Sequence, residues 1–294
     1  MKSRLMFLTH LGALGALAAS ALAVSAMAAP APPTGGPASA APSEADWRTP
    51  DPNNLLVIDT SKGRIIVELW PSIAPVSAAQ VRQLAHESFY DGRAFFRVID
   101  DFMDQTGDPK DTGEGGSTKP NLPAEFVFRR DAATSIVVVD STDTRESGFV
   151  WQAPVISQKT ALAELTADHK VNAMGDFCPG VVGMARTQDP ASGNSQFFLM
   201  RAAQTNLNGQ YTAVGRVISG LDVVRQIKTG EPVAAPQDKM LTVRVLADMP
   251  AAGRPVVRVI DTTGPWFAAQ IAHVRAEKVV GATPCDLDIP SQVK

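Results

Sequence analysis

The chain contains 294 residues, of which 45% are hydrophobic, and its formal net charge is −3 at pH 7. This is enough apolar material for one sizeable folded domain with extensions, or for two small domains. The near balance of charges and the lack of a Lys/Arg-rich run argue against nucleic acid as a partner.

The first 28 residues have the pattern of a secretory signal peptide. Met1–Arg4 form a short basic region, residues 5–26 are mostly apolar, and Ala26-Met27-Ala28 is a small-x-small cleavage site. The alternative is an uncleaved anchor, because the apolar stretch is nearly long enough to span a bilayer. Its Ala and Gly content favours cleavage. We therefore expect an exported protein, periplasmic or secreted, that does not contact the membrane after cleavage.

The remaining chain divides by composition. An Ala-, Pro-, Gly- and Ser-rich stretch predicts a disordered tether, and a region that fits the strand pattern of its flanks less well predicts an insertion, with a strand at Ile136–Val139 and a helix at Thr160–Leu165. The predicted organisation is a signal peptide (1–28), the tether (29–52), a folded domain (53–250) that contains the insertion (about 127–179), and a C-terminal extension (251–294).

Short strands dominate the folded domain. Leu55–Thr60 and Arg64–Leu69 flank a Ser-Lys-Gly turn and predict a hairpin, and Pro75 opens a helix. A second short helix is expected near Leu221–Ile227. The other predicted strands are Phe95–Val98, Met103–Gln105, Val181–Ala185, Gln196–Met200, Thr212–Ile218 and Leu241–Leu246. Many short strands with two helices predict a mainly β fold, a closed antiparallel barrel with a helix over each end.

Two cysteines, Cys178 and Cys285, occur in the chain. Export would permit a disulfide, but spacing alone does not show whether the two residues approach each other, so two separate thiols remain the alternative. Neither cysteine has metal-ligand spacing with the histidines. We expect no metal and no cofactor.

A candidate binding strip lies in the segment FFRVIDDFMDQTGDP, residues 95–109. Side chains alternate along a strand, so Phe95, Arg97 and Ile99 share one face, and Met103 and Gln105 share a face after the turn. A guanidinium, a thioether and an amide together suit a ligand that is partly apolar and rich in carbonyl groups, such as a proline-containing peptide. The alternative, without a functional role, is that Arg97 is a surface arginine paired with a neighbouring aspartate.

Four segments in order resemble the signatures of cyclophilins, the peptidyl-prolyl cis-trans isomerases, and of their bacterial exported branch. They are FFRVIDDFMDQTGDP, TGEGG, GMARTQDPASGNSQFFLM and NGQYTAVGRVISGLDVV. The likeness runs from about Asn54 to Pro250 and is interrupted by the insertion. It implies a closed eight-stranded barrel capped by two helices, with a substrate groove on its outer surface and proline-containing polypeptides as substrates.

The resemblance also assigns residues by matching positions. Arg97 is the expected catalytic residue, because a guanidinium can donate a hydrogen bond to the prolyl nitrogen when the amide twists. The expected substrate-binding residues are Phe102, Met103, Phe198 and Leu207 in the proline pocket, Gln105 and Gln196 on the substrate backbone, Gly113, Ala185 and Arg186 in the neighbouring groove, and Tyr211 as an aromatic wall.

Two positions depart from the family pattern. Asn206 stands where many eukaryotic members carry Trp, and Tyr211 replaces their His. We therefore expect weak cyclosporin binding, while Tyr211 still lines the site. An alternative function is a cyclophilin-like chaperone or peptide-binding module with little turnover. A third is an envelope docking protein that acts through the insertion and the extension. The insertion is predicted to reshape or shield one end of the groove.

Overall fold

The computed structural model describes residues 41–278 and 281–294. The predicted signal peptide and the first part of the predicted tether, residues 29–40, lie outside the described residues. Among the helices of the described residues, none has both the length and the apolar character that crossing a membrane requires.

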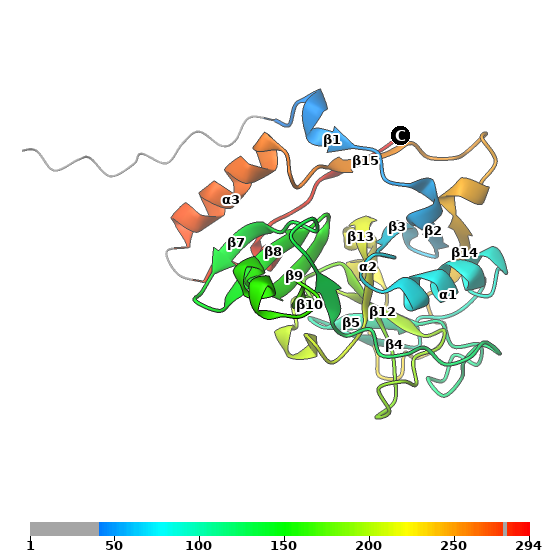
Figure 1. Ribbon diagram of the computed structural model, residues 1–294. Helices are drawn as coiled ribbons and strands as arrows, with labels where there is room; N and C mark the ends of the chain where they lie inside the picture. Colours follow the sequence, from blue (N-terminus) through cyan, green and yellow to red (C-terminus); the bar gives the residue numbers. More distant parts are fainter. Residues whose placement is uncertain (1–40, 279–280) are drawn as a thin grey trace, which may run out of the picture. The chain divides into compact units, whose positions relative to one another are not determined.

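Eight antiparallel strands form the main sheet, in the spatial order β14-β2-β3-β13-β11-β12-β5-β4 (Figure 1). Their bounds are β2 (Leu55–Thr60), β3 (Gly63–Leu69), β4 (Arg97–Ile99), β5 (Met103–Thr106), β11 (Val181–Met184), β12 (Phe197–Met200), β13 (Ala213–Ser219) and β14 (Met240–Val245). The predicted hairpin is confirmed, because β2 and β3 pair along their length with Thr60 opposite Gly63.

The main sheet is a half-barrel, and the closed barrel expected from the sequence is not confirmed. Within the described residues the edge strands β14 and β4 form no ladder with each other. Isolated bridges join Ala94 to Lys239 and Val98 to Gly230 near these edges. β4 pairs regularly along one edge only, with β5, so the opposite edge of the sheet is joined by isolated bridges and not by a ladder.

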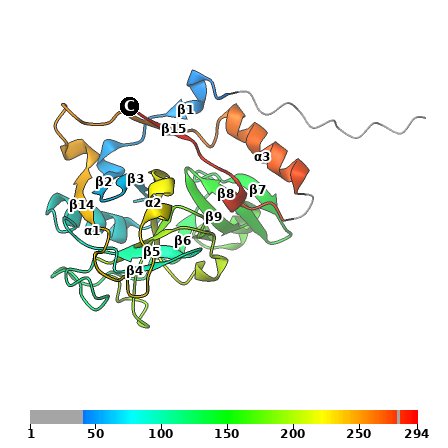
Figure 2. The ribbon, with the colours of Figure 1, turned by 180° about the vertical axis from the view of Figure 1, so that it is seen from behind.

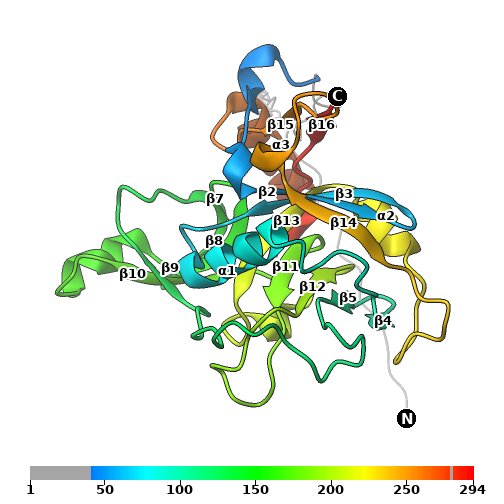
Figure 3. The same cartoon turned by 90° about the vertical axis from the view of Figure 1, so that its right-hand side faces the viewer.

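The main core lies between the inner face of this sheet and the helices α1 (Pro75–His86) and α2 (Leu221–Gln226) (Figure 3). Proline at the first turn of α1 starts the helix, as predicted. Alternate strand positions meet one face of the helix in this core, where the contributing residues include Leu56, Ile58, Ile65 and Val67 from the hairpin and Ala78, Val81, Leu84 and Ala85 from α1. The expected pair of helices on the sheet is therefore present.

The insertion folds as a second antiparallel sheet, in the order β6-β10-β9-β8-β7. Its strands are β6 (Phe128–Arg130), β7 (Val137–Ser141), β8 (Arg145–Val150), β9 (Ala153–Gln158) and β10 (Val171–Gly175). The strand expected at residues 136–139 appears as β7, and the expected helix is the 3-10 helix η3 (Thr160–Leu165). Arg130 on β6 is buried, where its Nε donates to Ser157 Oγ at 2.8 Å and its Nη2 pairs with Glu146 at 3.1 Å.

The C-terminal extension pairs with a segment near the start of the described chain. The strands β1 (Trp47–Arg48), β15 (Val257–Ile260) and β16 (Ser291–Val293) form a three-stranded sheet. The helix α3 (Pro265–Glu277) lies between β15 and β16 in the chain. Phe267 and Ile271 of α3 pack on Val139 and Phe149 of the insertion, and Figure 2 shows α3 beside β7 and β8.

The predicted tether is therefore wrong for residues 43–52. These residues form the 3-10 helix η1 (Glu44–Asp46), the strand β1 and the start of η2 (Pro52–Asn54). The reason is long-range packing that composition does not reveal. Trp47 joins the apolar cluster around Phe267, and Arg48 donates to both carboxylate oxygens of Glu68 on β3.

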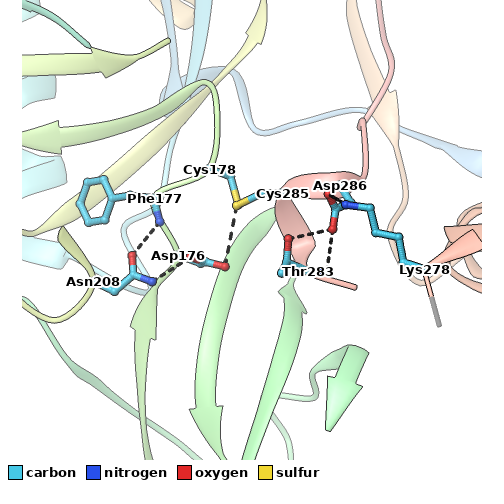
Figure 4. The surroundings of a disulfide bond; sticks show 8 residues. All are labelled: Asp176, Phe177, Cys178, Asn208, Lys278, Thr283, Cys285 and Asp286. Atoms are coloured by element: carbon cyan, nitrogen blue, oxygen red, sulfur yellow. Dashed lines mark hydrogen bonds and ion pairs between the residues drawn. A yellow bond between two sulfur atoms is a disulfide. The ribbon is translucent and has the colours of Figure 1, made fainter. Parts of the chain in front are cut away.

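The two cysteines form a disulfide, with an S–S distance of 2.07 Å between Cys178 and Cys285 (Figure 4). The bond joins the end of the insertion to the C-terminal extension across 107 positions of the chain. Of the two alternatives that the sequence left open, the structure thus shows the bridge rather than separate thiols.

Candidate active site

Strand register places the central candidate residues in one row across the main sheet. Arg97 on β4 lies opposite Gln105 on β5, and Gln105 lies opposite Phe198 on β12. Directly paired residues of antiparallel strands project from the same face. Sequence segments separated by about a hundred positions therefore present a guanidinium, an amide and an aromatic ring side by side.

Two adjoining hollows cover this row. The first, of about 100 Å³, is lined by Arg97, Phe102, Met103, Gln105, Ala185, Arg186, Phe198, Leu207 and Tyr211. The second, of about 170 Å³, is lined by Gln105, Gly113, Glu114, Gly115, Ala185, Arg186, Thr187, Ser192, Asn194 and Gln196. Gln105, Ala185 and Arg186 belong to both hollows. Every site residue predicted from the sequence lines one or both of them, while the role of each residue stays a prediction.

The floor of the first hollow is apolar and tightly packed. Met103, Phe198 and Leu207 are almost fully buried. The ring of Phe198 stacks on Phe177 at 5.9 Å between centroids. Beneath it, a Cβ on Gly183 would come within 2.3 Å of the Phe198 ring, so only glycine permits this packing. Sequence reasoning missed Phe177 and the packing role of Gly183, although Gly183 opens the GMART segment.

Arg97 is held at the edge of this floor by two side-chain partners. Its Nε donates to Glu231 Oε1 at 2.6 Å, and its Nη1 donates to Gln105 Oε1 at 3.3 Å. The arginine side chain keeps 36% of its exposure, so the ion pair is on the surface. The alternative prediction, a surface arginine paired with a neighbouring aspartate, is wrong about the partner, because Arg97 pairs with Glu231 and Asp100 pairs with Arg201. Sequence reasoning missed Glu231, which is 134 positions from Arg97 and carries no local signal.

A chain of hydrogen bonds continues from Arg97 into the second hollow. Gln105 Nε2 donates to Gln196 Oε1 at 2.9 Å. Gln196 Nε2 in turn donates to the carbonyl oxygens of Gly113 and Gly115, at 3.0 and 2.7 Å. Each amide is thereby fixed in orientation by a donor and an acceptor. The two hollows share one polar seam that runs from the guanidinium to the glycine loop.

Part of the wall of the first hollow is built from stacked groups. The Arg186 guanidinium lies 4.5 Å from the centroid of the Tyr211 ring and 5.4 Å from that of Phe126. Its Nε also donates to the carbonyl oxygen of Gln210 at 2.9 Å. Cation–π contacts of this kind hold an aromatic ring in place. Tyr211 meets the edge of Phe198 at 5.7 Å, so the wall and the floor form one packed unit.

The insertion borders this wall. Asn208, next to Leu207, accepts a hydrogen bond from the backbone of Phe177 at 2.9 Å and donates to Asp176 at 2.8 Å. Figure 4 shows this arrangement beside the disulfide. Burial raises the pKa of the Asp176 carboxyl above its ordinary value. The insertion thus lies beside the hollows, not across the sheet from Arg97, and its predicted effect on substrate access stays a prediction.

Beneath the site, Asp104 points to the opposite face of β5 from Gln105. It is completely buried, and Arg201 Nη1 lies 3.3 Å from its Oδ1. Burial outweighs the attraction of Arg201 and raises the pKa of Asp104 to about 7. This carboxyl is part of the support of the site and does not line either hollow.

Comparison with known proteins links this geometry to one family. Residues 55–246 match the family model of cyclophilin-type peptidyl-prolyl cis-trans isomerases. A probable peptidyl-prolyl cis-trans isomerase of Brucella suis is 37% identical over 191 residues, which cover 61% of this chain and 74% of the relative. The isomerase ppi1 of Schizosaccharomyces pombe is 31% identical over 171 residues, covering 58% and 82%.

One solved structure extends the likeness. Cyclophilin AquaCyp293 from Hirschia baltica is 37% identical, with a TM-score of 0.77, and the match covers 84% of this chain and 93% of that one. This share exceeds the stretch matched by the family model, so the similarity of fold includes residues outside 55–246.

Proposed function

Because the chain belongs to the cyclophilin-type peptidyl-prolyl cis-trans isomerases, we propose that Arg97 accelerates rotation of X-Pro bonds through a hydrogen bond that forms only in the twisted amide. The observation that carries this proposal is the position of the guanidinium. It lines a hollow whose floor is apolar, and it is held by Glu231 and Gln105.

The reaction requires a differential interaction. A peptide bond resists rotation by about 18–20 kcal/mol because nitrogen donates its lone pair into the carbonyl. At X-Pro the cis and trans forms differ by only about 0.5–1 kcal/mol, so the barrier is the obstacle. In the twisted transition state the prolyl nitrogen becomes pyramidal and recovers its lone pair. A guanidinium N–H can then donate to it, which favours the transition state over the planar ground state.

The geometry assigns complementary tasks to the neighbours of Arg97. Its two side-chain bonds use Nε and Nη1, and we assign the substrate bond to Nη2. Met103, Phe198 and Leu207 offer an apolar floor for the pyrrolidine ring. Residues before proline would occupy the second hollow, where Gln196 Oε1, which accepts one hydrogen bond from Gln105, has a second lone pair for a backbone N–H of the substrate. The chain of hydrogen bonds from Arg97 through Gln105 and Gln196 would hold one side of the X-Pro bond while the other side rotates.

The expected size of the arginine contribution is limited. A hydrogen bond to a charged group contributes about 1.5–3 kcal/mol, and each factor of ten in rate corresponds to about 1.4 kcal/mol. Arg97 should therefore supply roughly one to two decades. The apolar floor strengthens the interaction further by lowering the local dielectric.

A direct test is isomerisation of a short Ala-Pro tetrapeptide, measured without a coupled protease. Arg97→Ala should lower kcat/KM by roughly ten- to a hundredfold. Arg64→Ala is a matched control, because Arg64 is another half-exposed arginine in an ion pair, with Asp59. A folded Arg97→Ala protein with the rate of the wild type would show that the guanidinium does not act on the bond.

We also propose that the protein acts after export on exported polypeptides. The sequence pattern of residues 1–28 supports this, and so does the disulfide between Cys178 and Cys285, since such bonds persist in oxidising compartments. Cell fractionation followed by N-terminal sequencing tests it. The mature chain is expected in the envelope or medium, beginning at Ala29. A cytoplasmic chain that begins at Met1 would contradict it.

A chaperone-like role is the second candidate function, and the insertion favours it. Leu165 and Trp151 of the insertion keep 82% and 52% of their exposure, so the insertion presents apolar side chains to solvent. Suppression of the aggregation of a reduced, unfolded protein by the Arg97→Ala variant would separate holding of the chain from turnover. An Arg97→Ala protein that suppresses no aggregation would argue against this role.

A further inference from the structure

A third hollow lies on the insertion, outside the two that flank Arg97. Its volume is about 510 Å³, larger than either of them. Its apolar lining includes Val127, Ile156, Leu162 and Met174. We call it the insertion hollow.

Strand register explains the apolar base of the insertion hollow. Ile156 on β9 lies directly opposite Met174 on β10, so both side chains project from the same face of the insertion sheet. This is the face turned away from the buried Val155, since neighbours along a strand point in opposite directions. Val127, which precedes β6, keeps 48% of its exposure. Apolar side chains on an outer sheet face are typical of a binding surface.

The insertion hollow is separated from the proline pocket by a thin wall. Met174 Sδ lies 3.0 Å from the place that a Cβ on Gly209 would occupy, and Gly209 sits between Leu207 and Tyr211 of the pocket. On the other side, Val127 directly follows Phe126, the ring on which Arg186 stacks. One layer of residues thus has the proline pocket on one side and the insertion hollow on the other.

The rim of the insertion hollow is polar but nearly uncharged. Among its lining residues Arg145 alone is ionisable, and Thr144, Gln158 and Asn172 contribute hydroxyl and amide groups. An apolar base with amides at the rim suits an extended polypeptide, because the base takes side chains while the rim bonds the backbone. A strongly basic ligand would be repelled by Arg145, and an anionic small molecule would find only one cation.

We propose that the insertion hollow binds an extended apolar segment of the same polypeptide whose X-Pro bond lies beside Arg97. This rests on the proposed function, since it is the proline that brings the segment to the hollow. Two linked sites act together, because binding at one raises the effective concentration of the chain at the other. The insertion thereby selects long unfolded chains over short peptides.

The test compares two synthetic ligands by fluorescence anisotropy and by isomerisation rate. One is a blocked tetrapeptide with a single Ala-Pro bond. The other carries the same bond joined to about ten further residues of Leu, Val and Ser, which span roughly 33 Å when extended. The extension is placed before the proline in one version and after it in another. Wild type should bind one long version at least about tenfold more tightly than the tetrapeptide.

Two substitutions place the gain in the insertion hollow. Val127→Asn and, as a second variant, Leu162→Asn should each remove at least roughly half of this gain on a logarithmic scale, with unchanged kcat/KM for the tetrapeptide. Leu241→Asn is the matched control, since Leu241 is an apolar residue of similar exposure, 54%, on β14. The proposal is overturned if the long peptides bind no more tightly than the tetrapeptide, or if both insertion variants bind them as wild type does.

The outcome also separates this proposal from the proposed function. Wild type that fails to isomerise the tetrapeptide, yet binds a long peptide through Val127, would refute the role of Arg97 and support the insertion hollow. Normal isomerisation of the tetrapeptide, together with a long-peptide affinity that is unchanged by Val127→Asn and by Leu162→Asn, would support the role of Arg97 and refute the insertion hollow.

Discussion

The disulfide between Cys178 and Cys285 should contribute a large part of the folding stability. It closes a loop across 107 positions. In the chain-entropy description, a crosslink around a loop of this size destabilises the unfolded state by about 4.7 kcal/mol. Since the whole free energy of unfolding of a domain is about 5–15 kcal/mol, reduction should weaken the fold markedly. For a chain of this length the corresponding fall in Tm is roughly 10–20 °C.

Urea unfolding at 25 °C, with and without a thiol reductant, measures this contribution. Reduced wild type should lose about 4–5 kcal/mol relative to the oxidised protein. Cys285→Ala should resemble reduced wild type and should not respond to the reductant. A difference below about 1 kcal/mol between the oxidised and reduced proteins would refute the reasoning, because the unfolded chain would then gain little freedom when the crosslink is opened.

The same reduction should leave the chemistry of the folded protein nearly intact. Asn208 is held by hydrogen bonds with Asp176 and with the backbone of Phe177, and neither bond involves a cysteine sulfur. Tetrapeptide isomerisation at low temperature, where the reduced protein stays folded, should therefore proceed at close to the oxidised rate. A large loss of rate under these conditions would mean that the disulfide itself shapes the pocket.

Three further predictions concern single side chains. Glu231→Ala should lower kcat/KM for the tetrapeptide by roughly three- to tenfold, because Arg97 loses one of its two side-chain partners. Glu231→Gln keeps a hydrogen-bond acceptor and should retain most activity. The exposed ion pair contributes only about 0–1 kcal/mol to stability, so wild type and both variants should have equal urea midpoints. The pKa of Asp104 in the folded protein, about 7, lies above its ordinary value of 3.8, so the folded state binds more protons between these values and the free energy of unfolding should fall as the pH rises from about 4 to about 7. Urea titrations at several pH values should show a smaller fall for Asp104→Asn, and parallel curves for the two proteins would contradict this. Asn206→Trp should tighten cyclosporin binding, measured by calorimetry, and equal affinities of the variant and the wild type would show that position 206 does not set the affinity.

Much of the candidate site could be predicted because its segments carry their own pattern. Alternation predicts one face for Met103 and Gln105, and both line the first hollow. Arg97 lines the same hollow opposite Gln105, but Phe95, expected on the face of Arg97, precedes β4 and packs into the main core with Val98. The hairpin β2–β3 and the start of α1 follow in the same way from local apolar periodicity and from a proline at the first helical turn. Local rules suffice where the determinant lies within one element.

The features that sequence reasoning missed depend on contacts between distant segments. Glu231 reaches Arg97 only because the chain after α2 returns to the edge of β4. Trp47 is ordered because the extension supplies Ile260 as its partner, so a composition typical of a linker was misleading there. The half-barrel has the same origin, since closure depends on how two edges meet and not on how many strands are present.

The three-stranded sheet β1-β15-β16 has a consequence for the order in which the molecule matures. Trp47 leaves the ribosome early, yet its strand partner at Ile260 is made close to the end of synthesis. The outer side of the β2–β3 hairpin, with Leu55, Val57 and Ile66, likewise waits for Val257 and Val259 to cover it. In a nascent chain this apolar surface of the hairpin consequently stays exposed until β15 has been synthesised. A truncation that removes β15 would leave the surface permanently exposed to contact with other chains.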